Sequence, residues 1–186
     1  MRYFYDTEFI EDGRTIDLVS IGIVDEDGRE YYAVSTDVDS SKANAWVREN
    51  VLNQLPNPGS DVWKSNATIR REVLEFLTSG SGRPELWAWV GAYDHVVLAQ
   101  LWGDMAGLPR SLPRYTRELR QYWEFAGKPA LPGIPDGNHD ALVDARHNLA
   151  KFQACMKRPP PGPGRQGPAL TRPADSAGSA GSAGSA

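Results

Sequence analysis

Five polar residues in three separated segments have the types and spacing for metal-dependent chemistry on phosphate esters. Asp6 and Glu8 lie in DTEF, Asp94 lies in AYDHV, and His139 and Asp144 lie in HDALVDA. Four carboxylates can bind two hard divalent cations, and one imidazole can serve as a general base. Cleavage of a phosphodiester at neutral pH requires this combination, so the five residues predict a two-metal nuclease site.

The first pair lies in the aromatic-rich run 2–10, RYFYDTEFI, which predicts a β-strand. Side chains at positions i and i+2 project from the same face of a strand, so Asp6 and Glu8 should point together while Thr7 points away. Two adjacent carboxylates repel each other unless a cation or a shared proton neutralises them. A solvent-facing pair at a strand end is the alternative interpretation, and DTE alone does not exclude it.

Asp94 follows the apolar run 85–91, ELWAWVG, which fits a central buried strand. It precedes a helical period over 93–105, YDHVVLAQLWGDM, so a strand-to-helix turn is expected at 91–94. At the start of a helix, Asp94 could be a simple N-cap instead of a metal ligand.

Aromatic residues surround Asp94 in the sequence. Trp87, Trp89 and Tyr93 could form a stacking platform for unpaired bases. Packing in the hydrophobic core is the alternative interpretation for these side chains.

His139 and Asp144 are five positions apart, which places them about 140° apart around a regular helix. We therefore expect His139 in the loop before the helix 140–155, and Asp144 inside that helix. With its near-neutral pKa, His139 is suited to take a proton from the attacking water. His95 and His147 lie in no comparable group and are interpreted as surface or packing residues.

Composition limits the remaining function classes. A chain of 186 residues has room for one domain with a substantial core, and its net charge of −4 argues mildly against nucleic-acid binding by a bulk positive field. The single cysteine excludes an intramolecular disulfide and a cysteine-based zinc site. No apolar run approaches about 20 residues, and phosphate-binding glycine loops are absent. We expect a cytoplasmic protein without a membrane span.

The remaining pattern predicts a mixed α/β domain over residues 1–158. Two further strands are expected at 18–24 and 29–35, and three further helices at 42–55, 66–77 and 116–127. Residues 159–186 are rich in Pro, Gly, Ser and Ala, and they are expected to be a disordered tail.

In this order, the DxE, aromatic-Asp and HxxxxD motifs resemble the DEDDh branch of the 3′-to-5′ exonucleases, over about residues 1–155. Within that branch, MRYFYDTEFI and ELWAWVGAYDHV resemble bacterial RNase AS, exoribonucleases that prefer adenylate-rich 3′ ends. The resemblance implies an α/β, RNase H-like fold: a five-stranded mixed sheet flanked by helices, with the first three strands antiparallel. One departure is Val90, where many relatives have an asparagine, so the contact of that asparagine is not expected here.

The resemblance also implies roles for the site residues. Asp6 would bridge two Mg²⁺ ions, for which Mn²⁺ can substitute. Glu8 and Asp144 would complete the shell of the first ion, Asp94 would bind the second, and His139 would be the general base. Phe9 follows the DTE segment and either contacts the terminal base, as in relatives, or packs in the core.

The expected reaction is hydrolysis at single-stranded RNA 3′ ends or at 3′ overhangs of duplex RNA, with release of nucleoside monophosphates and a preference for adenylate. Relatives of this kind act as homodimers. Two alternatives stay open, a proofreading-type DNA exonuclease and a non-catalytic RNA-binding module. The second is disfavoured because all five motif residues are present.

A basic segment at 110–128 is the candidate for holding the RNA backbone. Arg114 and Arg117 are the main candidates, and with Arg120 they would share roughly one side of the segment. A solvated helix face explains these residues equally well. The basic residues of the segment are Arg110, Arg114, Arg117, Arg120 and Lys128.

Overall fold

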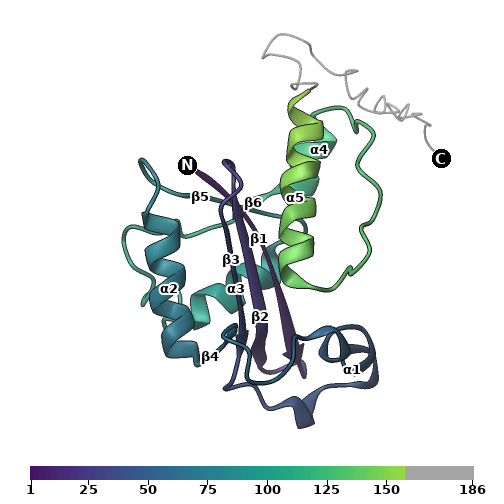
Figure 1. Cartoon of the computed structure of the whole chain (residues 1–186). Helices are drawn as coiled ribbons and strands as arrows, with labels where there is room; N and C mark the ends of the chain where they lie inside the picture. The colour runs from purple at the N-terminus through teal and green to yellow at the C-terminus, as the bar shows by residue number, and fades with distance from the viewer. Residues whose placement is uncertain (158–186) are drawn as a thin grey trace, which may run out of the picture.

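The computed structural model describes residues 1–157, so the predicted tail at 159–186 lies outside the described residues. Helices cover both faces of a mixed β-sheet, with α2 on one side and α5 on the other (Figure 1). The predicted α/β class is confirmed. No helix in the described part of the chain combines the length and apolarity needed to cross a membrane.

Within residues 1–157, the sheet has six strands in the order β4-β3-β2-β1-β5-β6. The strands are β1 (Arg2–Glu11), β2 (Ile16–Asp25), β3 (Glu30–Ser35), β4 (Trp63–Lys64), β5 (Glu85–Ala88) and β6 (Arg117–Glu118). The helices are α1 (Ala45–Asn50), α2 (Asn66–Thr78), α3 (Ala92–Gln100), α4 (Leu119–Phe125) and α5 (Ala141–Met156), with 3₁₀ turns η1 (Ser40–Lys42) and η2 (Leu52–Gln54).

The sheet topology follows the expectation closely. β1, β2 and β3 are antiparallel neighbours, and β5 pairs with β1 in parallel. The sheet has six strands and not the expected five, because the two-residue strands β4 and β6 extend its edges by parallel pairing with β3 and β5. Strands of two residues carry no hydrophobic period from which they can be predicted.

Three predicted helices differ from the observed ones. The helical period expected over 93–105 ends at Gln100, and Gly103 follows in the left-handed conformation with φ of 92°. The helix expected at 42–55 is divided into η1, α1 and η2, because the Asn44 side chain accepts a hydrogen bond from the Val47 N–H and starts α1 there. The helix expected at 116–127 begins only at Leu119, where the Glu118 side chain accepts the Arg120 N–H at 2.9 Å. Its first predicted turn is instead occupied by β6.

The alternation of side chains along β1 separates two packing faces. Tyr3 and Tyr5 are buried on the face covered by α2 and α3. Phe4 lies on the opposite face, where its ring centroid is 5.0 Å from that of Phe152 in α5. Asp6 and Glu8 continue the Phe4 face by the two-residue period, so β1 directs them toward α5.

Gly22 allows α5 to approach the sheet closely at this point. It is the β2 partner of Asp6, and a Cβ atom at Gly22 would lie 2.3 Å from the carbonyl carbon of Ala141. Only a residue without a side chain fits under the first turn of α5. The start of α5, with Asp144 in its first turn, is therefore held beside Asp6.

Candidate active site

A cleft of about 400 Å³ lies where β1, the first turn of α3 and the start of α5 meet. All five residues predicted for catalysis line this cleft, as do Phe9, Trp89 and Tyr93 from the expected substrate contacts. The lining residues are Asp6, Thr7, Glu8, Phe9, Trp89, Val90, Tyr93, Asp94, Asn138, His139, Asp144, Asn148 and Lys151.

Asp6 and Glu8 face the cleft from the same side of β1. Glu8 is only 8% exposed, so the solvent-facing interpretation of this pair is wrong. Burial raises the pKa of Asp6 well above its ordinary value, and the neighbouring charges of Asp94, Glu8 and Asp144 add to the shift. Burial, together with Asp144 and Asp94, also raises the pKa of Glu8 to about 8. The cleft thus concentrates negative charge that a bound cation would neutralise.

Asp94 lies in the first turn of α3 and is 6% exposed. Gly91 is the N-cap of this helix, so the capping interpretation of Asp94 is wrong. Its Oδ1 accepts hydrogen bonds from the Thr7 N–H at 2.8 Å and from Thr7 Oγ1 at 2.7 Å. Burial raises the pKa of Asp94 to about 6, although the bonds from Thr7 oppose the shift. Thr7, which the sequence placed on the opposite side of β1, therefore orients this carboxylate.

His139 lies in the turn before α5, as predicted, and its backbone has a left-handed φ of 71°. Its N–H donates to Asp144 Oδ2 at 2.8 Å, which ties the loop residue to the helix carboxylate. The ring packs edge-on against Trp46 with centroids 4.9 Å apart. Nothing in the sequence predicted this contact, because Trp46 lies in the distant helix α1.

The donor set fits a divalent cation. Within the described residues, Glu8, His139 and Asp144 each offer one ligand atom, and these atoms lie within 4.8 Å of one another. Carboxylate oxygens suit Mg²⁺ or Mn²⁺, whereas an imidazole nitrogen is a softer ligand than Mg²⁺ prefers. His139 was predicted as a base and not as a ligand, and this position gives it access to either role.

The aromatic residues divide between the cleft and the core. Phe9 and Tyr93 stack with ring centroids 5.6 Å apart and planes 8° from parallel, and Tyr93 is 54% exposed. Trp89 lines the cleft after the end of β5, with Lys151 Nζ 4.7 Å from its ring centroid. Trp87 is buried against Phe152 in the core, so its interpretation as a stacking platform is wrong.

Two α5 residues in the cleft were missed by the sequence analysis. Asn148 is buried, and its Nδ2 donates to the Tyr5 carbonyl at 3.2 Å. Lys151 Nζ donates to Asn148 Oδ1 at 3.2 Å. Both follow Asp144 at helical spacings of four and seven residues, which place them on its face of the helix. This spacing could have predicted that both residues face the cleft beside Asp144.

Arg114 and Arg117 do not line this cleft. They line a separate hollow of about 410 Å³ at the start of β5, together with Arg83, Glu85 and Tyr115. Arg117 Nε lies 3.4 Å from Glu85 Oε2, and Arg114 donates to the Met105 carbonyl. Because α4 begins only at Leu119, Arg120 is the one member of the expected arginine side that lies on this helix.

Comparison with known proteins supplies the family. Residues 1–156 match the model of the 3′-5′ exoribonuclease Rv2179c-like domain. The chain belongs to this family. Two relatives from Mycobacterium tuberculosis, the 3′-5′ exoribonucleases Rv2179c of strain H37Rv and MT2234.1 of strain CDC 1551, are each 61% identical over 154 residues. Each match covers 82% of this chain and 92% of the relative.

Solved structures agree with the fold of the Rv2179c-like domain. The zinc-bound Escherichia coli ExoI–ssDNA complex matches 84% of this chain and 40% of the ExoI chain, with a TM-score of 0.62 and 12% identity. Schizosaccharomyces pombe Pop2p, in a form with bound Mg²⁺ and Mn²⁺, matches 84% of this chain and 83% of its own, with a TM-score of 0.52 and 12% identity. At such low identity, these similarities establish the RNase H-like exonuclease fold alone.

Proposed function

We propose that this protein is a divalent-metal-dependent 3′-to-5′ exoribonuclease. It removes nucleoside monophosphates one at a time from single-stranded RNA 3′ ends, including 3′ overhangs of duplex RNA, and it prefers adenylate. The observation that carries the proposal is the convergence of Asp6, Glu8, Asp94, His139 and Asp144 in one cleft. The names of the two mycobacterial relatives support RNA as the substrate.

Asp6, Glu8, Asp94 and Asp144 are the proposed ligands of two Mg²⁺ or Mn²⁺ ions. When bound, such ions activate the attacking water and neutralise the charge of the scissile phosphate. His139 accepts the proton of that water, and its N–H bond to Asp144 Oδ2 holds the histidine backbone in place. The P–O3′ bond breaks, which leaves a 3′-hydroxyl on the shortened RNA and a 5′-phosphate on the released nucleotide.

The aromatic side chains of the cleft are the proposed base contacts. Tyr93 has an exposed ring, and the ring of Phe9 stacks parallel to it. Trp89 offers a second surface at the end of β5. Stacking of this kind accepts any base, so it accounts for binding of a single-stranded end and not for adenylate preference. Homodimer assembly stays a prediction from the resemblance, and a cytoplasmic location stays a prediction from the composition.

A substrate comparison tests the proposal. Matched RNA and DNA oligonucleotides of one sequence are incubated with Mg²⁺ or with EDTA, and the products are separated by length. We expect stepwise shortening of RNA from its 3′ end, slower loss of DNA, and no reaction in EDTA. Equal or faster loss of DNA would indicate a proofreading-type exonuclease. Binding of RNA without shortening would indicate the non-catalytic module, and rates on the four homopolymers test the base preference.

Replacement of a proposed metal ligand tests the mechanism. Asp6→Asn should lower turnover by more than about 10³-fold, because several kcal/mol of charge stabilisation depend on the cations. The control is Asp61→Asn, an exposed residue outside the cleft. Turnover is measured by release of mononucleotides, and Mg²⁺ binding by calorimetry. An active Asp6→Asn variant would rule out the two-metal assignment.

A further inference from the structure

A second and larger hollow of about 640 Å³ adjoins the catalytic cleft. Its walls come from the start of β2, the first turns of α2 and the second half of α3. No residue lining this hollow belongs to the five predicted for catalysis.

The two hollows share a wall. Phe9, which lines the cleft, is the cross-strand partner of Leu18, which lines the second hollow. On α3, Tyr93 lines the cleft, and Val97, one turn further along, lines the second hollow. The stacked rings of Phe9 and Tyr93 therefore stand between the two sites. A strand that passes over this stack from the cleft reaches the second hollow next.

The hollow carries three carboxylates and three cationic side chains, so its formal charge is balanced, but two of its guanidinium groups make no ion pair with the described residues. Asp37 Oδ2 accepts the Asn66 N–H at 2.8 Å, and Asp17 Oδ2 lies 3.5 Å from Lys42 Nζ. The third carboxylate, at position 39, accepts hydrogen bonds from the backbone and side chain of residue 41. Within residues 1–157, the exposed side chains of Arg14 and Arg70 form no ion pair.

Apolar side chains form part of the surface beside these charges. Buried Leu18 and Val97 and half-buried Ile16, Val38 and Leu101 line the same hollow. An apolar surface flanked by unpaired guanidinium groups suits a ribose-phosphate chain, whose sugars pack on the aliphatic carbons while its phosphates accept bidentate hydrogen bonds. A compact anion alone would leave the apolar surface uncovered.

We propose that this hollow binds the backbone of the RNA strand upstream of the 3′-terminal nucleotides, with Arg14 and Arg70 contacting its phosphates. The inference rests on the proposed exoribonuclease function. The strand leaves the catalytic cleft over the Phe9–Tyr93 stack and continues between β2 and α2. RNAs too short to cross the stack do not reach Arg14 or Arg70.

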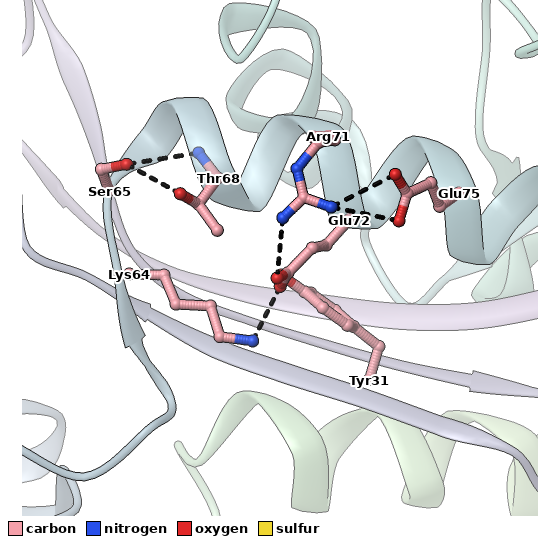
Figure 2. Close-up of polar contacts among 7 residues, drawn as sticks. All are labelled: Tyr31, Lys64, Ser65, Thr68, Arg71, Glu72 and Glu75. Atoms are coloured by element: carbon pink, nitrogen blue, oxygen red, sulfur yellow. Dashed lines mark hydrogen bonds and ion pairs between the residues drawn. The ribbon is translucent and has the colours of Figure 1, made fainter.

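Helix α2 offers a matched control at the next residue. Figure 2 shows Arg71 turned toward its own helix, with Nη1 3.2 Å from Glu75 Oε1 and Nη2 3.3 Å from Glu72 Oε1. Glu72 Oε2 also lies 2.7 Å from Lys64 Nζ, which fixes α2 to β4 (Figure 2). Arg71 does not line the hollow, whereas Arg70 does. Arg70→Glu and Arg71→Glu change the net charge equally, so they separate a local contact from a general charge effect.

The test compares substrate lengths. Initial rates are measured for a diadenylate and for an oligoadenylate of about eight nucleotides, a length in the range of single-strand binding sites. For Arg70→Glu, the ratio of kcat/KM on the long substrate to that on the short one should fall, and for Arg14→Glu combined with Arg70→Glu it should fall about tenfold. For Arg71→Glu, which matches Arg70→Glu in charge, the ratio should not change. Anisotropy of a labelled octaadenylate with Ca²⁺ in place of Mg²⁺ should show weaker binding and a shallower salt dependence for Arg70→Glu and for the double variant, but not for Arg71→Glu.

Three results would overturn the proposal. The first is an unchanged length ratio in the double variant, and the second is an equal fall in Arg71→Glu. The third is a length-dependent loss in Arg114→Glu and Arg117→Glu instead, which would route the strand through the hollow at the start of β5. Failure of the exoribonuclease function itself is distinguishable, because the wild-type protein would then shorten neither substrate.

Discussion

His139 and Asp144 are joined by the hydrogen bond from the His139 N–H to Asp144 Oδ2, and both lie near Glu8. This bond uses the backbone of His139 and leaves its ring nitrogens available. As a base, the ring takes a proton during the reaction. As a ligand, it holds a cation before the reaction begins. The two roles predict different consequences for the same substitution.

For His139→Ala we expect a general base to be lost, which lowers kcat by about 10²–10⁴-fold. Mg²⁺ affinity should remain close to that of the wild type, because the four carboxylates are retained. Single-turnover rates and calorimetric Mg²⁺ titrations measure the two quantities separately. His147→Ala is the control, since the half-buried His147 forms a hydrogen bond with the Pro132 carbonyl at 3.3 Å and does not line the cleft. A large loss of Mg²⁺ affinity in His139→Ala would make His139 a ligand.

The catalytic residues were predictable because short-range geometry decides their placement. The two-residue period of a strand places Asp6 and Glu8 on one face, and a five-residue spacing separates His139 from the helix of Asp144. Arg114 lies before the helix expected at 116–127, and Arg117 lies in β6 because α4 begins only at Leu119. The placement of Arg117 depends on pairing with β5, which no local pattern in the segment reports.

Among the elements, the turn between β5 and α3 carries backbone strain beside Asp94. Val90 has φ of 57° and is 53% exposed, so a β-branched residue adopts the left-handed conformation without compensating burial. The Glu118 carboxylate accepts the N–H groups of Val90 and Gly91 at 2.8 and 3.0 Å and holds the turn in this form.

Val90→Asn should therefore stabilise the protein by about 1 kcal/mol, because asparagine visits the left-handed region at lower cost. The expected rise in Tm is about 2–4 °C. Val96→Asn is the matched control, because Val96 is similarly exposed but lies inside α3, where asparagine brings no gain. A Tm that falls or stays constant in Val90→Asn would contradict this account of the turn.

The contact between α5 and β2 gives a second prediction for the elements. In Gly22→Ala, the new methyl group would meet the Ala141 backbone at 2.3 Å and displace the first turn of α5. We expect a loss of about 1–3 kcal/mol in unfolding free energy. Weaker Mg²⁺ binding should accompany it as Asp144 moves away from Asp6. Gly133→Ala is the control, since a Cβ there meets no atom within 4 Å. Unchanged Mg²⁺ affinity in Gly22→Ala would show that the contact between Gly22 and α5 does not position Asp144 for metal binding.

The long strands and helices could be predicted from the sequence, whereas the two-residue strands could not. The strands β1 to β3 and the helices α2 and α5 repeat their hydrophobic period several times. This repetition indicates whether each element is a strand or a helix and which of its faces is buried. The two-residue strands β4 and β6 exist only because a longer neighbour offers hydrogen bonds at the sheet edge. The divided segment at 40–54 depends on a single cap at Asn44, which interrupts an otherwise helical pattern.

At the scale of the whole molecule, the buried carboxylates of the cleft make the stability of the folded protein depend on pH and on bound metal. The pKa of Glu8 is raised from 4.5 to about 8, so between these values the folded protein retains a proton that the unfolded chain releases. This contribution to stability is fully present below pH 4.5 and is lost as pH rises through about 8. The raised pKa of Asp6 acts in the same direction.

In EDTA, we therefore expect the Tm to fall as pH rises from about 5 to about 8. Saturating Mg²⁺ should remove most of this fall, because a bound cation stabilises the ionised carboxylates. Thermal unfolding across this range with and without Mg²⁺ measures the effect. In Glu8→Gln, the slope in EDTA should be smaller. A Tm that is constant or rises over the same range in EDTA would contradict the buried cluster of carboxylates.

The site draws its first carboxylate from β1 and its last from α5, at the two ends of the described domain. Within the domain, Asp6 and Glu8 are therefore synthesised well before Asp144. Until α5 packs over Gly22, the cleft lacks its last carboxylate. The wide separation of the motifs thus makes assembly of the cleft depend on synthesis of nearly all of the described residues.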